Sequence, residues 1–596
     1  MHSKRSNISR VFSIAVVAAI LLTACAKTPE ESKHIPKNAG VVIGINSKQI
    51  VQKLVTNGIT MDKFFSSLQE QDTSSEAAKA MKDIENSGVD INSNFFASVV
   101  FGENGAASYV SLTGSLKDAG KFENFLKQKV QGVTPTAKGD FTYAWLPADE
   151  ALVGWNKQTV IYLRAFDMDE LKHRGQRKMM GIPDGDDQDS SEDAAIVDSA
   201  AAIPTVLTVA EDGPTTWVPV MDHLFHLKDN ETAGSIEAFK SLLKENADAT
   251  FFVNPQVIVN GQQLTMMPAN FKELLDGSFY TAAVNFEEGK VVMNGRSYAG
   301  KKMAEIYKKY GNITLDMDML EKYPSDNIDA FVAYGYDMRM LGDIIKTTGM
   351  DGIVNMGLGQ AQLTMDDILN AFKGQMVFVS SDFSMGKKPN PYFPQDSIEK
   401  ADSKWVFAMK VGDKAAFEKV MNSPMVKQWL HKEGDQYVME QAMPGMPALS
   451  INDKLVVAAS DSALLQSYLS GKGKATLDNE IAGKIKGNPL GAYVNFEKFA
   501  AGMPADQLQG PDSSLKLQAK NLLKDLRAVS QPFNGSTQES QVVLNFKNSS
   551  ENSLAQLVNL GMAFAKYHKE HKDDDNTAAG DSMMVPQGLD SAAVAP

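Results

Sequence analysis

Two stretches of the chain share one pattern of apolar and polar positions. Residues 110–126 read VSLTGSLKDAGKFENFL, and residues 405–421 read WVFAMKVGDKAAFEKVM. Each begins with a largely apolar segment that predicts a strand, passes through a polar turn containing Asp, and continues with the spacing of an amphipathic helix. Phe122 and Phe417 occupy matching helix positions, 295 residues apart. The pattern therefore predicts a strand–turn–helix unit that occurs twice.

A predicted hairpin follows each copy of this unit. The first covers residues 151–162 and bends near Asn156, and the second covers residues 448–457 and bends near Asn452. Asn tolerates the left-handed backbone of tight turns. The two Asn residues are 296 positions apart, so the spacing of the repeat is almost unchanged.

Further blocks recur in the same order. Beyond residue 175, fewer residues separate the corresponding positions of the two halves. These blocks are Val41–Ile45 with Ala330–Tyr334, Asp229–Gly234 with Asp478–Gly483, and Phe251–Asn254 with Ala492–Asn495. The fall from 295 to 241–249 residues predicts an insertion in the first half, near residues 176–220. Its acidic residues are Asp184, Asp186, Asp187, Asp189, Glu192 and Asp193. Low hydrophobicity with high charge predicts a disordered loop.

The repeat predicts an internally duplicated α+β protein. We expect a first half over 35–310 and a homologous second half over 323–570, followed by a disordered acidic tail over 573–596. Strands predicted in hairpins indicate antiparallel sheets, with helices packed mainly on one face. Duplication also predicts a pseudo-symmetric cleft between the halves, where ligands commonly bind.

The N-terminus predicts export and lipidation. Lys4, Arg5 and Arg10 precede an apolar run over 11–22, which is too short to span a bilayer. The run ends in Leu22, Thr23, Ala24 and Cys25, which resembles the lipobox of bacterial lipoproteins. That resemblance implies a signal peptide over 1–24, acylation of Cys25 and a tether over 25–34.

The same segment predicts where the protein is located. Cleavage before Cys25 removes three basic residues and no acidic one, which changes the formal net charge from -14 to -17. No other stretch reaches about 18 consecutive apolar residues, so the body is expected outside the bilayer. Ala26 and Lys27 follow Cys25 without Asp. In lipoproteins this favours the outer membrane, on its periplasmic face or at the cell surface.

Composition excludes several kinds of site. Cys25 is the single cysteine among 596 residues, so intramolecular disulfides and multi-cysteine metal sites are excluded. A pI near 5.2 argues against a nucleic-acid partner. We find no nucleophile elbow, P-loop or dinucleotide fingerprint, and Gly357-Leu358-Gly359 is expected to be a loop. The sequence therefore predicts no catalytic residue and no cofactor.

The candidate metal ligands are few. His223 and His226 are three residues apart and could share a helix face, but no third ligand can be named, so two ordinary histidines are the favoured interpretation. The acidic insertion does not fit an EF-hand frame, and loose calcium binding by charge stays open. We therefore predict no metal site.

Paired carboxylates have a structural and a catalytic interpretation. Asp366-Asp367 is typical of a helix N-terminus. Asp229-Asn230-Glu231 and Asp478-Asn479-Glu480 occur in both halves, which favours shared helix caps over a glycosidase pair.

The layout resembles an uncharacterised family of bacterial lipoproteins, the domain-of-unknown-function 4836 family. The resemblance rests on the lipobox over 22–25, on Ile35-Pro36-Lys37-Asn38-Ala39, and on the Phe122-Glu123 helix with its repeat, and it covers most of 25–570. It implies location and architecture but no known activity.

We therefore expect a lipid-anchored envelope protein that is not an enzyme and binds a protein or glycan partner. The alternatives are an envelope hydrolase that acts on glycan through carboxylates, and an assembly or chaperone-like factor. Convergent carboxylates with perturbed titration in one pocket would indicate an enzyme. An apolar or aromatic patch would indicate a binding module.

Overall fold

The structure is a computed structural model that describes residues 29–60, 86–102, 106–166, 213–261, 268–311, 313–389, 397–440, 446–471, 473, 475, 477, 479–504 and 513–570. The signal peptide, Cys25, most of the acidic insertion and the acidic tail lie outside these residues.

The first half contains ten described strands. In chain order its elements are η1 (Glu30–His34), β1 (Ala39–Asn46), α2 (Ser47–Thr56), β2 (Asn94–Val100), β3 (Tyr109–Ser115), α5 (Ala119–Lys129), β4 (Thr136–Lys138), β5 (Phe141–Leu146), β6 (Ala151–Trp155), β7 (Thr159–Ala165), α7 (Gly213–Phe225), η2 (Asp229–Glu231), η3 (Ala233–Ser235), α8 (Glu237–Lys244), β8 (Ala249–Val253), α9 (Pro255–Gly261), α10 (Ala269–Leu275), β9 (Phe279–Glu287), β10 (Lys290–Tyr298) and α11 (Lys301–Tyr310).

The second half also contains ten described strands. Its elements are α12 (Asp318–Glu321), β11 (Ile328–Gly335), α13 (Met338–Thr348), α14 (Asp351–Gly359), α15 (Met365–Ala371), β12 (Phe372–Pro389), β13 (Ser397–Val411), α16 (Lys414–Met421), η4 (Val426–Gln428), β14 (Leu430–Glu433), β15 (Gln436–Met439), β16 (Ala448–Ile451), β17 (Leu455–Ala459), α17 (Ser462–Leu469), α18 (Asn479–Ile485), β18 (Leu490–Asn495), α19 (Phe496–Ala501), α20 (Ser513–Leu522), β19 (Leu523–Ser530), β20 (Thr537–Phe546) and α21 (Ser553–Glu570).

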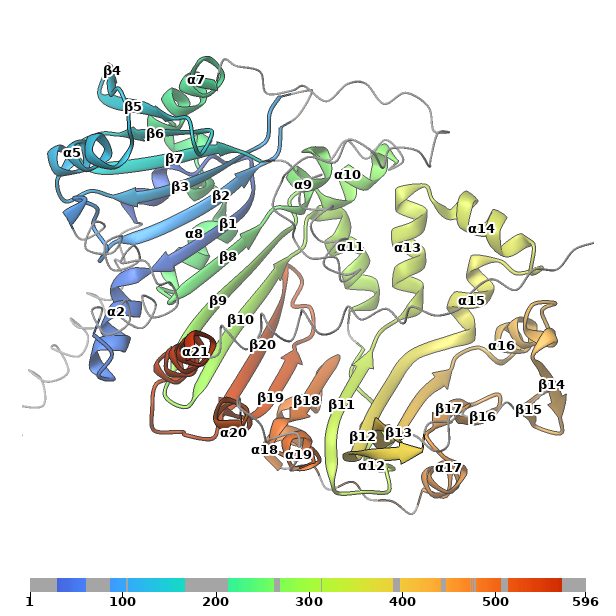
Figure 1. Ribbon diagram of the computed structural model, residues 1–596. Coiled ribbons are helices and arrows are strands. Elements are labelled where there is room, and N and C mark those ends of the chain that lie inside the picture. The colour runs from blue at the N-terminus through green and yellow to red at the C-terminus, as the bar shows by residue number, and fades with distance from the viewer. Residues whose placement is uncertain are drawn as a thin grey trace, which may run out of the picture.

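All described strands belong to one antiparallel sheet that runs through both halves (Figure 1). Its order is β4-β5-β6-β7-β3-β2-β1-β8-β9-β10 and then β20-β19-β18-β11-β12-β13-β17-β16-β15-β14. Read outward from the centre, the two halves have the same strand order. The α+β class and the antiparallel sheet predicted from the sequence are confirmed.

The register of the sheet confirms the duplication. Val42 of β1 pairs with Phe252 of β8, and Phe331 of β11 pairs with Tyr493 of β18. In the aligned blocks of the sequence, Val42 matches Phe331 and Phe252 matches Tyr493. The two pairings are therefore equivalent in the two halves. An unrelated pair of α+β segments would have no reason to keep the same register.

The predicted turns occur in both halves, and the helix caps repeat as well. The Asn156 side chain accepts hydrogen bonds from the backbone N–H groups of Gln158 and Thr159 at 2.9 and 2.8 Å, and Asn452 accepts two equivalent bonds at 2.9 Å. Asp118 and Asp413 cap α5 and α16 by accepting backbone hydrogen bonds. Each side chain satisfies N–H groups that the turn or helix start would leave unpaired.

The two halves join edge to edge through β10 and β20. Asn294 faces Gln541 at the middle of this pairing, and the two residues are 247 positions apart, which is within the offset of the repeat. The Gln541 side-chain amide donates to Asn294 Oδ1 at 3.0 Å. The pseudo-twofold axis therefore passes through this residue pair. Backbone hydrogen bonds connect the halves here, so the cleft expected between them takes the form of a groove over the joined strands, lined in part by Asn294 and Gln541.

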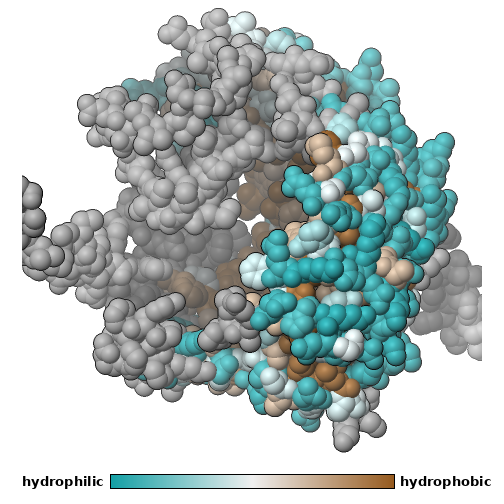
Figure 2. All heavy atoms as spheres, turned by 90° about the vertical axis from the view of Figure 1, so that its right-hand side faces the viewer, coloured by the Kyte–Doolittle hydropathy of each residue, from teal (hydrophilic) through white to brown (hydrophobic). Residues whose placement is uncertain are grey.

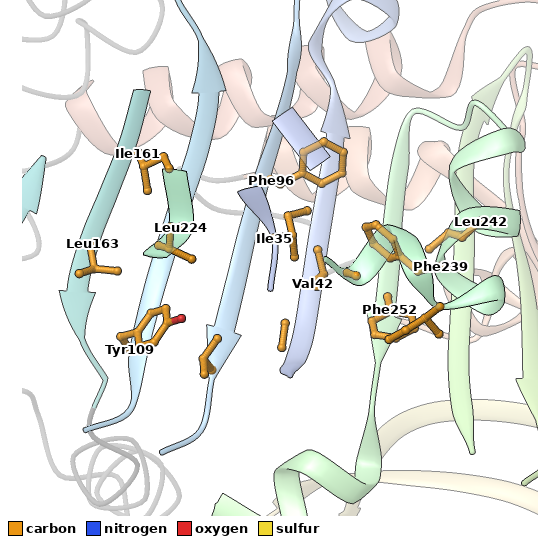
Figure 3. Close-up of a cluster of buried hydrophobic side chains, with 14 of the residues drawn as sticks. Ile35, Val42, Phe96, Tyr109, Ile161, Leu163, Leu224, Phe239, Leu242 and Phe252 are labelled. Carbon is orange, nitrogen blue, oxygen red and sulfur yellow. The ribbon is translucent and has the colours of Figure 1, made fainter. Parts of the chain in front are cut away.

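Helices cover one face of the inner strands and both faces of the outer strands. Val42, Phe96 and Phe252 pack with residues of α7 and α8 in the main core of the first half (Figure 3). Along β6, Leu152 belongs to this core and Val153 packs against α5. Because neighbouring strand residues point to opposite faces, α5 and α7 lie on opposite sides of the sheet. The second half repeats this arrangement with α17 and α16.

The last helix of each half packs against the other half. Helix α11 follows β10 and contacts α13, whereas α21 follows β20 and contacts α2. Figure 1 shows the two contacts at opposite corners of the central sheet, with α2 and α21 at lower left and α11 and α13 at upper right. The halves therefore exchange their closing helices.

Two expected boundaries differ from the structure. Residues 29–34, expected in the tether, form the start of the fold, since η1 buries Glu31 and Ser32, and Ser115 donates to Glu31 at 2.6 Å. Residues 213–220, expected in the disordered insertion, begin helix α7, whose Trp217 is 1% exposed. Residues 213–220 pack into the core through Trp217, and residues 29–34 contact the fold through the Ser115–Glu31 hydrogen bond and the His34–Phe225 ring contact.

Candidate binding site

A pocket of about 180 Å³ lies at the contact between α11 and the second half. Its lining has four tyrosines among mostly uncharged residues: Tyr307, Tyr310, Gly311, Ile313, Tyr334, Gly335, Tyr336, Asp337, Met340, Pro489, Leu490, Ser530, Phe533 and Gln538. Sites for drug-sized ligands usually measure about 300–1,000 Å³, so this pocket has room for one small ring-sized group.

A local difference between the halves positions Tyr336 in the pocket. Strand β1 passes directly into α2, with Asn46 as its N-cap, whereas Tyr336 and Asp337 separate β11 from α13. Asp337 caps α13 by accepting the Arg339 backbone N–H at 3.0 Å. The cap fixes the connection, and the additional residues place Tyr336 next to Tyr334.

The aromatic rings form two groups. Tyr334 and Tyr336 stack with centroids 5.7 Å apart and planes at 15°. Tyr307 of α11 lies 5.0 Å from Phe533, with the two ring planes at 31°. Both separations are typical of favourable ring contacts. The pocket thus combines rings from both halves of the chain.

The charged residue of the pocket lining, Asp337, is paired with Arg339. Asp337 accepts two hydrogen bonds from the Arg339 guanidinium, at 2.6 and 2.9 Å, and these bonds hold the pKa of Asp337 below its ordinary value. Burial raises the pKa of Tyr336 to about 12, and it also raises the pKa of Tyr334 and Tyr307. The tyrosine hydroxyls are therefore protonated at neutral pH.

The equivalent contact in the other corner is closed. There, Leu54 of α2 and Ile59 are buried against Ala555 of α21, with Ile50 and Val558 packed around them. Aliphatic side chains fill this junction, whereas tyrosines line an open pocket at the other. The pseudo-symmetry of the sheet does not extend to the chemistry of its two junctions.

A second, polar groove of about 380 Å³ crosses the central strands. Its floor includes Arg296, which contacts Glu539 at 3.1 Å and Glu245 at 3.4 Å. Burial raises the pKa of Glu245. Two carboxylates therefore converge on one guanidinium near the pseudo-twofold axis.

The sheet face opposite α8 and α17 exposes apolar side chains in both halves. Ile43 and Leu112 of the first half are 36% and 48% exposed, and Val332 and Phe378 of the second half are 48% and 41% exposed. Ile43 and Val332 are equivalent residues of β1 and β11. Figure 2 shows apolar residues recessed beside a surface of mainly hydrophilic residues. Exposed apolar side chains are the feature expected of a binding module.

Of the two candidate metal-binding histidines, His223 lies in the last turn of α7 and His226 directly follows the end of that helix. His226 has acceptors rather than a metal-ligand arrangement, since its ring contacts the Asp222 carbonyl at 2.8 Å and Asp140 at 3.0 Å. No group of three or more metal-binding side chains occurs among the described residues.

Asp366-Asp367 lies at a helix N-terminus, as the sequence predicts, whereas the described residues do not show the predicted shared caps at 229–231 and 478–480. Asp367 and Thr364 form a capping box at the start of α15. Residues 229–231 form η2, and Asn479 begins α18, whereas Asp478 lies outside the described residues. The prediction of a loop at Gly357-Leu358-Gly359 is wrong, because these residues belong to α14. The lipobox, Leu22, Thr23, Ala24 and Cys25, also lies outside the described residues.

The tyrosine pocket was missed from the sequence. The motif Tyr334-Gly335-Tyr336 was visible at the end of a predicted strand, but Tyr307 and Phe533 are distant in the chain. Only the exchange of α11 brings them together.

Residues 32–172 match the model of a family described as a domain of unknown function (DUF4836). Over these residues, about a quarter of the chain, the sequence is similar to the DUF4836 family. The resemblance expected for most of 25–570 is thereby confirmed for the segment from η1 to the region beyond β7. The second half repeats the strand order of this segment.

No curated protein matches the sequence. Solved structures similar to this chain include two crystal forms of the Treponema protein TP0453. Form IV has 9% identity and a TM-score of 0.21, and the match covers 48% of this chain and 88% of that chain. Form I has 10% identity and a TM-score of 0.19, and the match covers 46% and 79%. TM-scores this low support no conclusion about fold or function.

Within the described residues, no helix combines the length and the hydropathy needed to cross a membrane.

Proposed function

We propose that this protein is a lipid-anchored, non-catalytic binding protein of the bacterial cell envelope, and that its ligand occupies the tyrosine pocket. The supporting observation is the difference between the two exchanged-helix junctions. One is closed by Leu54, Ile59 and Ala555, and the other keeps a pocket lined by Tyr334 and Tyr336. A contact that only joined the halves would gain more from close packing, because an open pocket forfeits dispersion contacts.

The anchor in this proposal is Cys25, at the end of the lipobox. Replacement of Cys25 by Ala should abolish acylation and release the protein from the outer-membrane fraction. Labelling with a radioactive fatty acid and membrane fractionation measure both effects. Retention of the Cys25→Ala variant in the membrane would contradict lipid anchoring.

Binding in the pocket is tested with a library of neutral, ring-bearing fragments and saturation-transfer NMR. Fragments that bind the wild-type protein should lose their signal with Tyr336→Ala and keep it with Tyr280→Ala. Tyr280 is a matched control because it is 38% exposed on β9 and does not line the pocket. If no fragment depends on Tyr336, the pocket is not a ligand site.

A glycan hydrolase is a second candidate, because Glu245 and Glu539 converge in the central groove and burial raises the pKa of Glu245. Structural ion pairs also perturb pKa values, and both carboxylates contact Arg296. The test is release of reducing ends from purified envelope glycan. Release that is lost in Glu539→Gln would establish the hydrolase, and its absence would favour the binding protein.

A further inference from the structure

The ring surfaces of the pocket favour a flat ligand that carries polarised C–H groups. The faces of aromatic rings carry partial negative charge, so they attract the positive edges of other groups. Tyr334 and Tyr336 are half-buried and stacked, and Tyr307 with Phe533 forms the second ring group. Helix α11 supplies Tyr307, and the second half supplies the other three rings.

The charges of the pocket favour a neutral ligand. Asp337 is the one charged residue of the lining, and the Arg339 guanidinium occupies both of its oxygens. Asp343, beside the pocket, accepts hydrogen bonds from Lys309 and from the Tyr310 hydroxyl, both at 3.1 Å. A charged ligand would lose hydration here without gaining a free counter-charge, which is unfavourable.

Hydrogen-bonding groups of the pocket remain open to a ligand. Among the described residues, the hydroxyls of Tyr307, Tyr334 and Tyr336 have no hydrogen-bond partner. Each hydroxyl can donate one hydrogen bond and accept others. Ser530 and Gln538 add polar atoms at the same opening. The complementary ligand therefore carries several hydroxyl groups as well as an apolar ring face.

We propose that the ligand of this pocket is a neutral pyranoside, a single sugar ring of a glycan. A pyranose ring presents axial C–H groups on one face and hydroxyls around its rim, which matches tyrosine faces and tyrosine hydroxyls. The pocket volume of about 180 Å³ holds one such ring and not a disaccharide. This inference rests on the proposed function and specifies the ligand class of that same site.

The test uses the acylated full-length protein in detergent and saturation-transfer NMR with three probes. These are methyl β-D-glucopyranoside, its charged analogue methyl β-D-glucuronide, and N-acetyl-L-tyrosinamide as a neutral non-sugar ring. The neutral pyranoside should bind most tightly, with the largest saturation on its ring C–H protons. Tyr336→Ala should weaken that binding about tenfold, and Tyr336→Phe should weaken it less, because it keeps the ring and loses the hydroxyl.

The outcomes separate this inference from the proposed function. If N-acetyl-L-tyrosinamide binds in a Tyr336-dependent manner and the pyranoside does not, the pocket is a ligand site but the sugar assignment is wrong. If no probe depends on Tyr336, both fail. Tyr280→Ala is the matched control and should bind like the wild-type protein. Circular dichroism and thermal unfolding of each variant identify a loss of binding that results from misfolding. If Tyr336→Ala is misfolded, the Tyr336→Phe variant shows whether binding depends on Tyr336.

Discussion

Two buried carboxylates have opposite electrostatic surroundings. Asp248 and Asp329 are 0% and 1% exposed, and each accepts a backbone N–H, from Phe286 and Phe383 respectively, at 2.7 Å. Asp248 is also ion-paired with Lys53, whereas no ion pair of Asp329 occurs among the described residues. The same substitution should therefore have opposite effects at the two sites.

Asp248→Asn should destabilise the protein by about 2–3 kcal/mol, because it leaves the Lys53 ammonium without its partner. The loss is below that of a fully buried pair, since the Lys53 side chain is 27% exposed. Denaturant unfolding at pH 7 measures the change. A loss below about 0.5 kcal/mol would show that Lys53 finds solvent or another acceptor.

Asp329→Asn should stabilise the protein at neutral pH. Burial raises the pKa of Asp329 above its ordinary value of about 3.8. The native state then binds a proton more tightly than the unfolded state, so stability falls as pH rises from about 4 through the folded pKa. Asn cannot ionise and avoids this loss. Its advantage should be largest at pH 7.5 and vanish near pH 3.5, as measured by unfolding at both values. Destabilisation at pH 7.5 would mean that attraction to Lys498 outweighs burial.

At the scale of elements, the exchanged helices make each half depend on the other. Leu54 on α2 is 4% exposed and packs against Ala555 of α21. Leu54→Ala should cost about 2–4 kcal/mol of unfolding free energy, through lost burial and the remaining cavity. Its neighbour Val55 is 50% exposed, so Val55→Ala should change stability by less than about 0.5 kcal/mol. Equal effects of the two substitutions would show that the α2–α21 contact contributes little.

Local elements were predicted well because local chemistry determines them. The hairpins at Asn156 and Asn452 and the helix starts after Asp118 and Asp413 follow from turn and cap residues within a few positions. The ordered structure of residues 29–34 was not predicted, because Glu31 is held by a hydrogen bond from Ser115, which is distant in the chain. Short-range signals cannot report contacts of that kind.

At the scale of the whole molecule, the duplication was predicted and the way the halves combine was not. Apolar patterns identify β10 and β20 as strands, but they do not show which strand edges meet. The pairing of Asn294 with Gln541 uses the edges left free by the two halves, and it places α11 and α21 on the opposite half. The tyrosine pocket is a consequence of that pairing, so no local motif indicated it.

The same topology relates the anchor to the pocket. Pro29 lies beside Gly44, Ile45 and Asn46 at the C-terminal end of β1. The tyrosine pocket lies at the C-terminal end of β11. An odd number of antiparallel pairings separates the two strands, so they run in opposite directions and these ends lie at opposite edges of the sheet (Figure 1). If Cys25 is acylated, the pocket faces away from the bilayer.

The short connection to the anchor makes this orientation testable. Residues 25–28 span at most about 14 Å, so the C-terminal end of β1 must remain near the membrane surface. A dye on Lys48→Cys, at the start of α2, should be quenched by headgroup spin-labelled lipids in vesicles that carry the acylated protein. A dye on Lys308→Cys, beside Tyr307, should not. Insertion of a Gly/Ser linker of about 20 residues after Lys27 should remove the difference, because such a chain spans about 25 Å on average and lets the body reorient. Equal quenching at both sites without the linker would refute this orientation, since a body held by so short a segment cannot present both edges to the bilayer.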